Sequence, residues 1–342
     1  MRGFFDEEYR MERLTTLNDP LVKMNRVIDW DGFRTTIELA FPQTDKKLGG
    51  RPPYDRVLLF KILILQKMYG LSDQGIEYHI TDRLSFMRFL GLSIADRIPD
   101  EKTVWHYREQ LTKAGVIDQL FVQLTERLRK AGLIVNEGKI IDAQIVSAPI
   151  QRNSRSDNSQ IKNDEIPEHW SGNKRRQKDT DARWTKKHGR KYFGYKNHIK
   201  VDIKSKLIET FETSSANAHD SLFLEGLLDE TDKGQRLYAD SAYESDNHRK
   251  LLRRKKIHCY IHKKAKRNQP LTPKQKTANH IKSSVRARVE HPFGHMKKCI
   301  KGVSVKCIGL ARATAQITLT NICYNLQRSI FLLQSQKLDI II

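Results

Sequence analysis

Residues 139–146 read KIIDAQIV, and residues 237–240 read LYAD. Each stretch holds an apolar run typical of a buried β-strand, and each then reaches an aspartate, Asp142 or Asp240. A buried carboxylate without a partner costs several kcal/mol, so an aspartate at the end of a core strand usually has a cation, a cap or a turn to justify it. For either aspartate alone, a cap or a turn is the better explanation.

Further strands and helices are predicted around these two runs. Apolar patterns predict strands at 192–203, 207–213, 235–239 and 257–262, and helices at 221–228 and 246–256. Strands first, then strands alternating with helices, indicate an α/β or α+β domain with one mixed sheet. Residues 147–190 are rich in polar and basic residues, and we expect them to form a long, mobile basic loop. We expect a final helix beyond Arg312 to pack on the sheet.

The chain of 342 residues is strongly basic, with 62 Lys and Arg against 40 Asp and Glu and a net charge of +22. Two stretches hold nearly all of this excess. Residues 171–200 contain 11 basic and 2 acidic residues, and residues 249–274 contain 11 basic residues and no acid. Charge concentrated in this way predicts dedicated surfaces for a polyanion, with nucleic acid the first candidate. Either stretch alone could also be a solvated loop or a localisation tract.

The N-terminal part of the sequence has helical patterns. Apolar residues recur at helical spacing over 54–68, and three shorter helices follow, the last over 101–114. The expected caps and stop signals are Gly70, Ser72, Asp82, Gly91, Asp100 and Gly115. We therefore predict an all-helical DNA-binding domain over 1–132 and an α/β domain over 133–335. Arg83, Lys102 and Arg108 on polar faces suit a helix-turn-helix reader of DNA, although a plain helical scaffold fits equally well.

The cysteines and the apolar stretches bear on the cell compartment. Cys259, Cys299, Cys307 and Cys323 form no C-x-x-C pair, and we expect them to be reduced in a cytosolic compartment. The N-terminus has no apolar core of a signal peptide, and Lys61 interrupts the longest apolar stretch. We therefore expect a cytoplasmic protein with no contact to a membrane.

A third acidic residue, Glu290, lies in the sequence SSVRARVEHPFGHMK at residues 283–297. Arg286 precedes it by four residues and Lys297 follows it by seven. At about 100° per residue, these steps return to nearly the same side of a helix. The simplest explanation is an exposed ion pair worth a few tenths of a kcal/mol. The ring of Pro292 opposes the carbonyl of Arg288, so we expect a kink just after Glu290.

The order Asp142, Asp240, Glu290, with the flanking Arg286 and Lys297, resembles the DDE transposases of bacterial insertion sequences that carry a Tyr-Arg-Glu-Lys signature. Insertion-sequence family five is the most similar group. The resemblance covers roughly residues 50–330 and includes YGLSD at 69–73, DRLSFMRFLGL at 82–92, IPDEKT at 98–103, AHDS at 218–221 and ADSAY at 239–243. One position departs from the pattern, because Ser283 stands where the signature has tyrosine.

This resemblance implies an RNase H-like catalytic domain in which Asp142, Asp240 and Glu290 hold two divalent cations. An all-oxygen ligand set favours Mg²⁺ or Mn²⁺, and no organic cofactor is expected. Two metal ions can activate a water or a 3′-hydroxyl and stabilise the leaving oxygen, which DNA cleavage and strand transfer both require. The expected contacts to DNA phosphates are Arg286, Lys297, Lys298, Arg288, Lys263, Lys264, Arg267 and Lys196.

The implied partners are the inverted-repeat ends of the element and its target DNA, bound by a homo-oligomer associated with the bacterial nucleoid. Two other functions stay open on the sequence. The first is an RNase H-like nuclease that cleaves DNA and never rejoins it. The second is a DNA-binding protein without catalysis, against which the three acidic residues and Lys297 argue.

Overall fold

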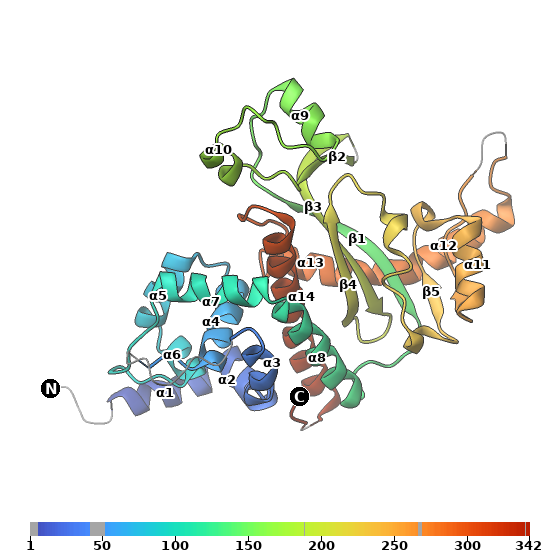
Figure 1. The fold of residues 1–342 in the computed structure, drawn as a ribbon. Helices are drawn as coiled ribbons and strands as arrows, with labels where there is room; N and C mark the ends of the chain where they lie inside the picture. Colours follow the sequence, from blue (N-terminus) through green and yellow to red (C-terminus); the bar gives the residue numbers. More distant parts are fainter. Residues whose placement is uncertain (1–5, 42–51, 188, 266–268, 339) are drawn as a thin grey trace. The chain divides into compact units, whose positions relative to one another are not determined.

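The computed structural model describes residues 6–41, 52–187, 189–265, 269–338 and 340–342 (Figure 1). The chain divides into two compact units. The first consists of residues 1–133, 299–301 and 318–342, and the second of residues 134–298 and 302–317. The last helix, α14 (Leu310–Gln336), therefore contributes residues to both units. The expectation that this helix packs on the sheet holds for its first turns alone.

The first unit is helical throughout its described residues. Its elements are α1 (Asp6–Thr16), α2 (Pro20–Val27), η1 (Asp31–Phe33), α3 (Arg34–Glu38), α4 (Arg56–Tyr69), α5 (Asp73–Asp82), α6 (Leu84–Leu90), α7 (Glu101–Lys113), α8 (Val116–Lys130) and the later part of α14. Gly70 and Gly91 end α4 and α6 with left-handed φ values of 64° and 75°. Ser72 and Asp100 cap α5 and α7 through their side chains. These predicted signals are confirmed.

One predicted cap is wrong, because Asp82 is the last residue of α5 rather than the cap of the next helix. The backbone N–H of Arg83 still donates to the carbonyl of His79, so α5 holds its hydrogen bonding to this point. Arg83 then turns to an extended backbone with φ −113° and ψ 109° and directly precedes α6.

The core of the first unit forms around α4, most of whose residues are buried. The second part of α14 belongs to the same core: Thr318 donates to Asp118 at 2.6 Å, and Cys323 lies 3.8 Å from the carbonyl of Ile64. The backbone N–H of Asp29 also donates to the carbonyl of Ile342 at 2.8 Å. A fragment of residues 1–132 would therefore lack part of its own core.

The second unit is built on a six-stranded mixed sheet. Its strands are β1 (Lys139–Ser147), β2 (Arg183–Lys187), β3 (Arg190–Asp202), β4 (Ile208–Ser215), β5 (Arg236–Tyr238) and β6 (His258–Cys259). The central order is β4-β3-β1-β5-β6, and β2 pairs with the first part of β3. β3 is antiparallel to β1 and β4, whereas β5 is parallel to β1 and β6. This is the order of an RNase H-like sheet, and the predicted fold class is confirmed.

Helices and short 3-10 turns connect these strands. They are α9 (Arg155–Lys162), α10 (Gly172–Gln177), η2 (Asp220–Phe223), η3 (Glu230–Asp232), η4 (Ser241–Tyr243), α11 (Asp246–Arg254), α12 (Pro273–Arg286), η5 (Ala287–Val289) and α13 (Glu290–Lys298). The helix predicted at 221–228 is thus only the 3-10 turn η2 followed by irregular turns. Ile141 of β1, Leu237 of β5 and Leu252 of α11 meet in one apolar core.

The prediction of a long, mobile loop over 147–190 is wrong, because this stretch contains α9, α10 and β2. Ser154 and Asp157 form a capping box at the start of α9. The Tyr195 hydroxyl donates to the Asp179 carboxylate at 2.7 Å, and Trp170 is 2% exposed. Order here comes from caps, one buried hydroxyl and one tryptophan, none of which produces an apolar period in the sequence.

The predicted kink near Glu290 lies on the other side of that residue. The 3-10 turn η5 separates α12 from α13, so the break precedes Glu290 instead of following it. Pro292 then falls in the first turn of α13, where a missing N–H leaves no hydrogen bond unmade.

Buried ion pairs hold the start of β1 and the end of β3. The Lys139 ammonium pairs with Glu209 and lies 3.7 Å from Asp202, and all three side chains are fully buried. Lys200 pairs with Asp229 at 2.7 Å and with Asp232 at 2.8 Å. Burial raises the pKa of Glu209, and the charge of Lys139 works against this rise. Each cation therefore compensates carboxylates that would be costly to bury alone.

We expect Lys139→Met to lower the free energy of unfolding by about 3–5 kcal/mol, because it leaves two buried carboxylates without their cation. Urea titration followed by circular dichroism measures this change. Lys204 is the matched control, since it pairs at the surface with Glu137 at 2.7 Å. Lys204→Met should change the free energy of unfolding by at most about 1 kcal/mol. Equal losses in the two variants would contradict the special weight given to the buried pair.

Candidate active site

Asp142 lies within β1, and Asp240 follows the end of β5, the strand that pairs with β1 in parallel. In this pairing Ile140 is opposite Tyr238, and each aspartate comes two residues later in the sequence. Neighbouring strands of a sheet lie about 4.8 Å apart, so the pairing brings the two aspartates to the same end of β1 and β5. The charge of Asp240 also raises the pKa of Asp142, so the two carboxylates act on each other.

The ionisation of Asp142 is perturbed by its surroundings. Burial raises its pKa above the ordinary value, and the charge of Arg286 opposes that rise. The Arg286 guanidinium donates to Oδ2 of Asp142 at 2.8 Å, while the backbone N–H of Ala143 donates to Oδ1 at 2.8 Å. The ionised form nonetheless stays disfavoured, which is the electrostatic state of a site that gains from a further cation.

Asp240 has a structural task as well. It caps the 3-10 turn η4, and its Oδ1 accepts from the backbone N–H of Ala242 at 2.6 Å. The cap expected for a lone aspartate at a strand end is therefore present. A cap of this kind uses one carboxylate oxygen, so the second oxygen of Asp240 can still bind a ligand.

Glu290 stands apart from this pair. It is exposed at the first position of α13, directly after η5, and η5 packs near β1. Within the described ranges, no group of three or more His, Cys, Asp or Glu side chains is arranged to hold a metal ion. The structure thus brings together two of the three predicted acidic residues. Arg286, four residues before Glu290, forms an ion pair with Asp142.

The predicted DNA contacts differ in their surroundings. Lys196 forms hydrogen bonds within the protein, because its ammonium donates to the carbonyl of Ala218 and to Asp220, each at 2.7 Å. Arg267 lies outside the described residues. The exposed members of the set are Arg288, Lys297, Lys298, Lys263 and Lys264.

Tyr243 is a site residue that the sequence did not single out for a role. Its side chain is 1% exposed, and its hydroxyl has no hydrogen-bond partner within the described part of the chain. Burial raises its pKa well above the ordinary value, as do the charges of Asp142, Asp220 and Asp240. The buried hydroxyl therefore lies within the electrostatic field of the acidic site. The available signal was its position three residues after Asp240 in the ADSAY motif, where a 3-10 turn folds the chain back.

Ser283, which replaces the tyrosine of the signature, also lies near this site. Its hydroxyl is 3.3 Å from Nε2 of His262, whose backbone N–H donates to the carbonyl of Ala239. Burial lowers the pKa of His262, and the neighbouring Arg286 lowers it further. The hydroxyl therefore serves as a neutral hydrogen-bond partner of a histidine next to Asp240.

The sheet order and the two aspartates define an RNase H-like α/β protein with an acidic site on β1 and just after β5. Comparison with protein families narrows this class. A family model described as a transposase DDE domain matches residues 135–326, and a second one described as a transposase domain matches residues 9–110. The chain belongs to the DDE transposase family. DNA is the partner on which this family of enzymes acts, and the family implies dependence on a divalent metal.

One solved structure is also similar, a cryo-EM structure of a piggyBac transposase synaptic complex with hairpin DNA. It is 12% identical with a TM-score of 0.46, over 92% of this chain and 73% of that chain. Both values are too low to support a conclusion about function. Among the described helices, none has the length and apolar character needed to cross a bilayer.

We expect Asp142→Asn to raise the melting temperature of the metal-free protein at neutral pH, because it removes a carboxylate whose charged form is disfavoured. Since the folded pKa is raised, the folded chain binds this proton more tightly than the unfolded chain. The advantage of the variant should therefore be absent at pH values below the unfolded pKa and should grow as pH rises through the folded pKa.

Scanning calorimetry with and without Mg²⁺ measures both effects. Mg²⁺ should raise the melting temperature of the wild type and leave that of Asp142→Asn nearly unchanged. Glu225→Gln, at a carboxylate that is 67% exposed, is the control and should keep the response to Mg²⁺. A lower melting temperature of metal-free Asp142→Asn would mean that the ion pair with Arg286 outweighs the cost of burial.

Proposed function

We propose that the chain is the transposase of an insertion sequence, which binds the inverted-repeat ends and catalyses both DNA cleavage and strand transfer. The observation that carries this proposal is that the pairing of β1 with β5 brings Asp142 and Asp240 together inside a DDE transposase domain. Membership of insertion-sequence family five remains part of the proposal, and it rests on the motifs of the sequence.

The donor set fits a hard divalent cation. Asp142 and Asp240 offer carboxylate oxygens, and the raised pKa of Asp142 shows that its charge is incompletely compensated. We propose that these two residues, together with Glu290, hold two Mg²⁺ or Mn²⁺ ions. When bound, such ions supply activation of a water or a 3′-hydroxyl and stabilisation of the leaving oxygen.

Each of the active-site residues has a separate task in this proposal. Asp142 and Asp240 bind from the fixed sheet. Arg286 holds the Asp142 carboxylate through its hydrogen bond of 2.8 Å and would also attract a DNA phosphate. Glu290 follows the 3-10 turn η5, which lies next to β1, and would supply the third carboxylate from there.

The exposed cations of α13 and its neighbourhood would bind DNA phosphates. Lys297 follows Glu290 by seven residues, so both lie on one side of α13. We propose that Lys297, Lys298 and Arg288 hold the backbone near the scissile bond, and that Lys263 and Lys264 hold it further away. Arg267 keeps the same role as a prediction. The contacts of Lys196 assign it to positioning Asp220.

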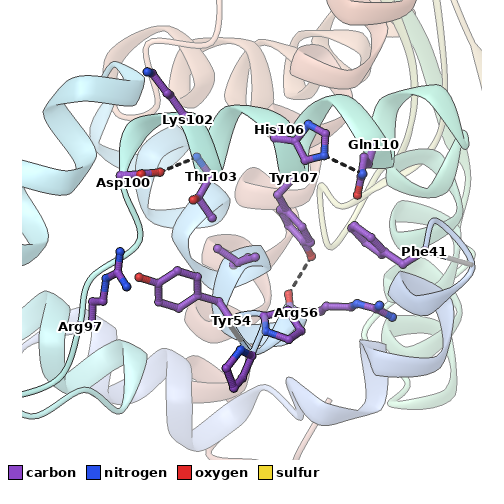
Figure 2. A pocket seen from close by; sticks show the side chains of 13 residues that line it. Phe41, Tyr54, Arg56, Arg97, Asp100, Lys102, Thr103, His106, Tyr107 and Gln110 are labelled. Carbon is purple, nitrogen blue, oxygen red and sulfur yellow. Dashed lines mark hydrogen bonds between the residues drawn. The ribbon is translucent and has the colours of Figure 1, made fainter. Parts of the chain in front are cut away.

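For the helical unit we propose recognition of the element ends, carried by the exposed face of α7. Two of the cations expected on polar faces lie on this helix. The Arg108 guanidinium donates to both carboxylate oxygens of Asp73, at 2.6 and 2.7 Å, whereas Lys102 is exposed. Lys102 lines a cavity of about 600 Å³ together with Arg97. Figure 2 shows Arg97 beside the ring of Tyr54, and Lys102 on α7, with Asp100 and Thr103 between the two cations in this view.

The direct test of the active site is cleavage and strand transfer by the purified full chain with Mg²⁺ on duplexes that carry the element ends. Asp142→Asn and Asp240→Asn should each lower the cleavage rate at saturating protein by at least 1,000-fold, roughly 4 kcal/mol or more of transition-state stabilisation, and leave end binding nearly intact. Asp240→Cys should regain cleavage with Mn²⁺ before it does so with Mg²⁺, because a thiolate is a softer ligand. Cleavage without strand transfer in the wild type would identify a nuclease, and normal nicking by either Asn variant would overturn the assignment.

The reader assignment is tested by Arg97→Gln/Lys102→Gln in the full chain. We expect this variant to lose preference for element ends over random duplexes in a competition shift assay. Lys130→Gln/Lys337→Gln, at exposed cations of the same unit outside α7, is the control and should keep the preference. If the test variant discriminates as well as the wild type does, the exposed face of α7 is not the reader.

A further inference from the structure

The hairpin formed by β2 and the start of β3 places like charges opposite one another. In its register, Lys186 is paired with Lys191, and Lys187 with Arg190. All four side chains are exposed, and over the described ranges none forms an ion pair with an acid. Like charges directly opposite on two strands are destabilising. A hairpin that keeps two such pairs beside each other gains most from a polyanion that neutralises both.

The base of this hairpin is fixed to the second unit. Phe193 is buried in the core next to β1, and the Arg183 guanidinium donates to the carbonyl of Ile161 at 2.9 Å and to Asp164 at 2.7 Å. Gly194 has φ 149°, and a Cβ there would lie 2.3 Å from the carbonyl oxygen of Val146. The backbones are therefore in close contact at the base of the hairpin.

The end of the hairpin, in contrast, is open. Gly189 turns the chain with φ 78°, and a Cβ built on it would meet no atom within 4 Å. Trp184 of β2 is 43% exposed, and its ring packs on Phe193 at a centroid distance of 5.3 Å. An aromatic ring beside a row of cations is typical of surfaces that bind nucleic acid.

The hairpin continues directly into the part of β3 that pairs with β1. Gly194 at its base is opposite Ser147, and Ile199 is opposite Asp142, so the base of the hairpin lies five residues along β1 from the aspartate. At about 3.3 Å per residue this is roughly 17 Å along the strand. A DNA strand whose scissile phosphate approached Asp142 would bring its neighbouring phosphates toward the hairpin.

We propose that the β2–β3 hairpin is a DNA-binding ribbon, in which Lys186, Lys187, Arg190 and Lys191 hold phosphates that flank the scissile bond. This proposal rests on the proposed function, since it assumes that DNA is cut at Asp142 and Asp240. The contacts are to the backbone of DNA, so they carry no sequence preference. The repulsion within the hairpin is relieved when the phosphates bind.

The first test is the salt dependence of DNA binding by the full chain. Lys187→Gln/Arg190→Gln should weaken binding to duplexes with and without an element end by the same factor. It should also reduce the slope of log affinity against log salt by about 1.8, which corresponds to two lost phosphate contacts. Lys204→Gln/Lys233→Gln removes two exposed lysines away from the hairpin and should leave the slope unchanged. An unchanged slope in the hairpin variant, or an equal loss in the control, overturns the proposal.

The second test uses the like-charge pair itself. Lys187→Glu places an opposite charge across from Arg190, so this variant should melt at or above the temperature of the wild type while it binds DNA more weakly. A hairpin with a purely structural role would not weaken binding while stability is kept. Normal DNA affinity of Lys187→Glu counts against the proposal.

Asp142→Asn in the same binding and cleavage assays separates this proposal from the proposed function. If Asp142→Asn loses cleavage while the hairpin variants bind as the wild type does, the hairpin proposal fails and the active site stands. If Asp142→Asn cleaves normally while the hairpin variants bind weakly, the active-site assignment fails and the hairpin remains a DNA-binding ribbon.

Discussion

The parallel pairing of β1 with β5 is the constraint on which the rest of the site depends. This pairing sets Ile140 opposite Tyr238, and it thereby sets Asp142 beside Asp240 although 97 residues separate them in the sequence. A slip of one residue would turn one aspartate to the opposite face of the sheet. The apolar core around Ile141 and Leu237 fixes the register, so hydrophobic packing on one face determines where charge gathers.

The second unit treats its charges in two opposite ways. At the start of β1, Lys139 and its carboxylates are fully buried and compensate each other. Around Asp142 the compensation is incomplete, because Asp240 and burial disfavour its charge and Arg286 offsets only part of this. Groups with perturbed ionisation tend to gather at functional sites, and the contrast within one strand locates that site independently of any sequence motif.

Much of this arrangement could be predicted from the sequence, for reasons that differ between elements. β1 and α4 have strong apolar patterns, and Gly70 and Gly91 mark helix ends through conformations that favour glycine. The order of Asp142, Asp240 and Glu290 in the sequence predicted the DDE transposase family. The fold of 147–190 escaped prediction, because its order depends on long-range contacts such as that of Tyr195 with Asp179. Tyr243 escaped because its burial near the charges of Asp142 and Asp240 follows only from the fold.

Long-range contacts also explain why residues 147–190 are folded although their sequence predicts a mobile loop. The hairpin of β2 and β3 is polar and basic where a stable hairpin would alternate charges across its strands, so local preference argues against it. Its base is held by Phe193, which packs in the core, and by Arg183, which donates to the carbonyl of Ile161. Stability supplied at the base thus permits repulsion at the end. Local sequence preference and the final fold disagree most often where a surface serves a partner, and here the disagreement consists of four cations opposite one another.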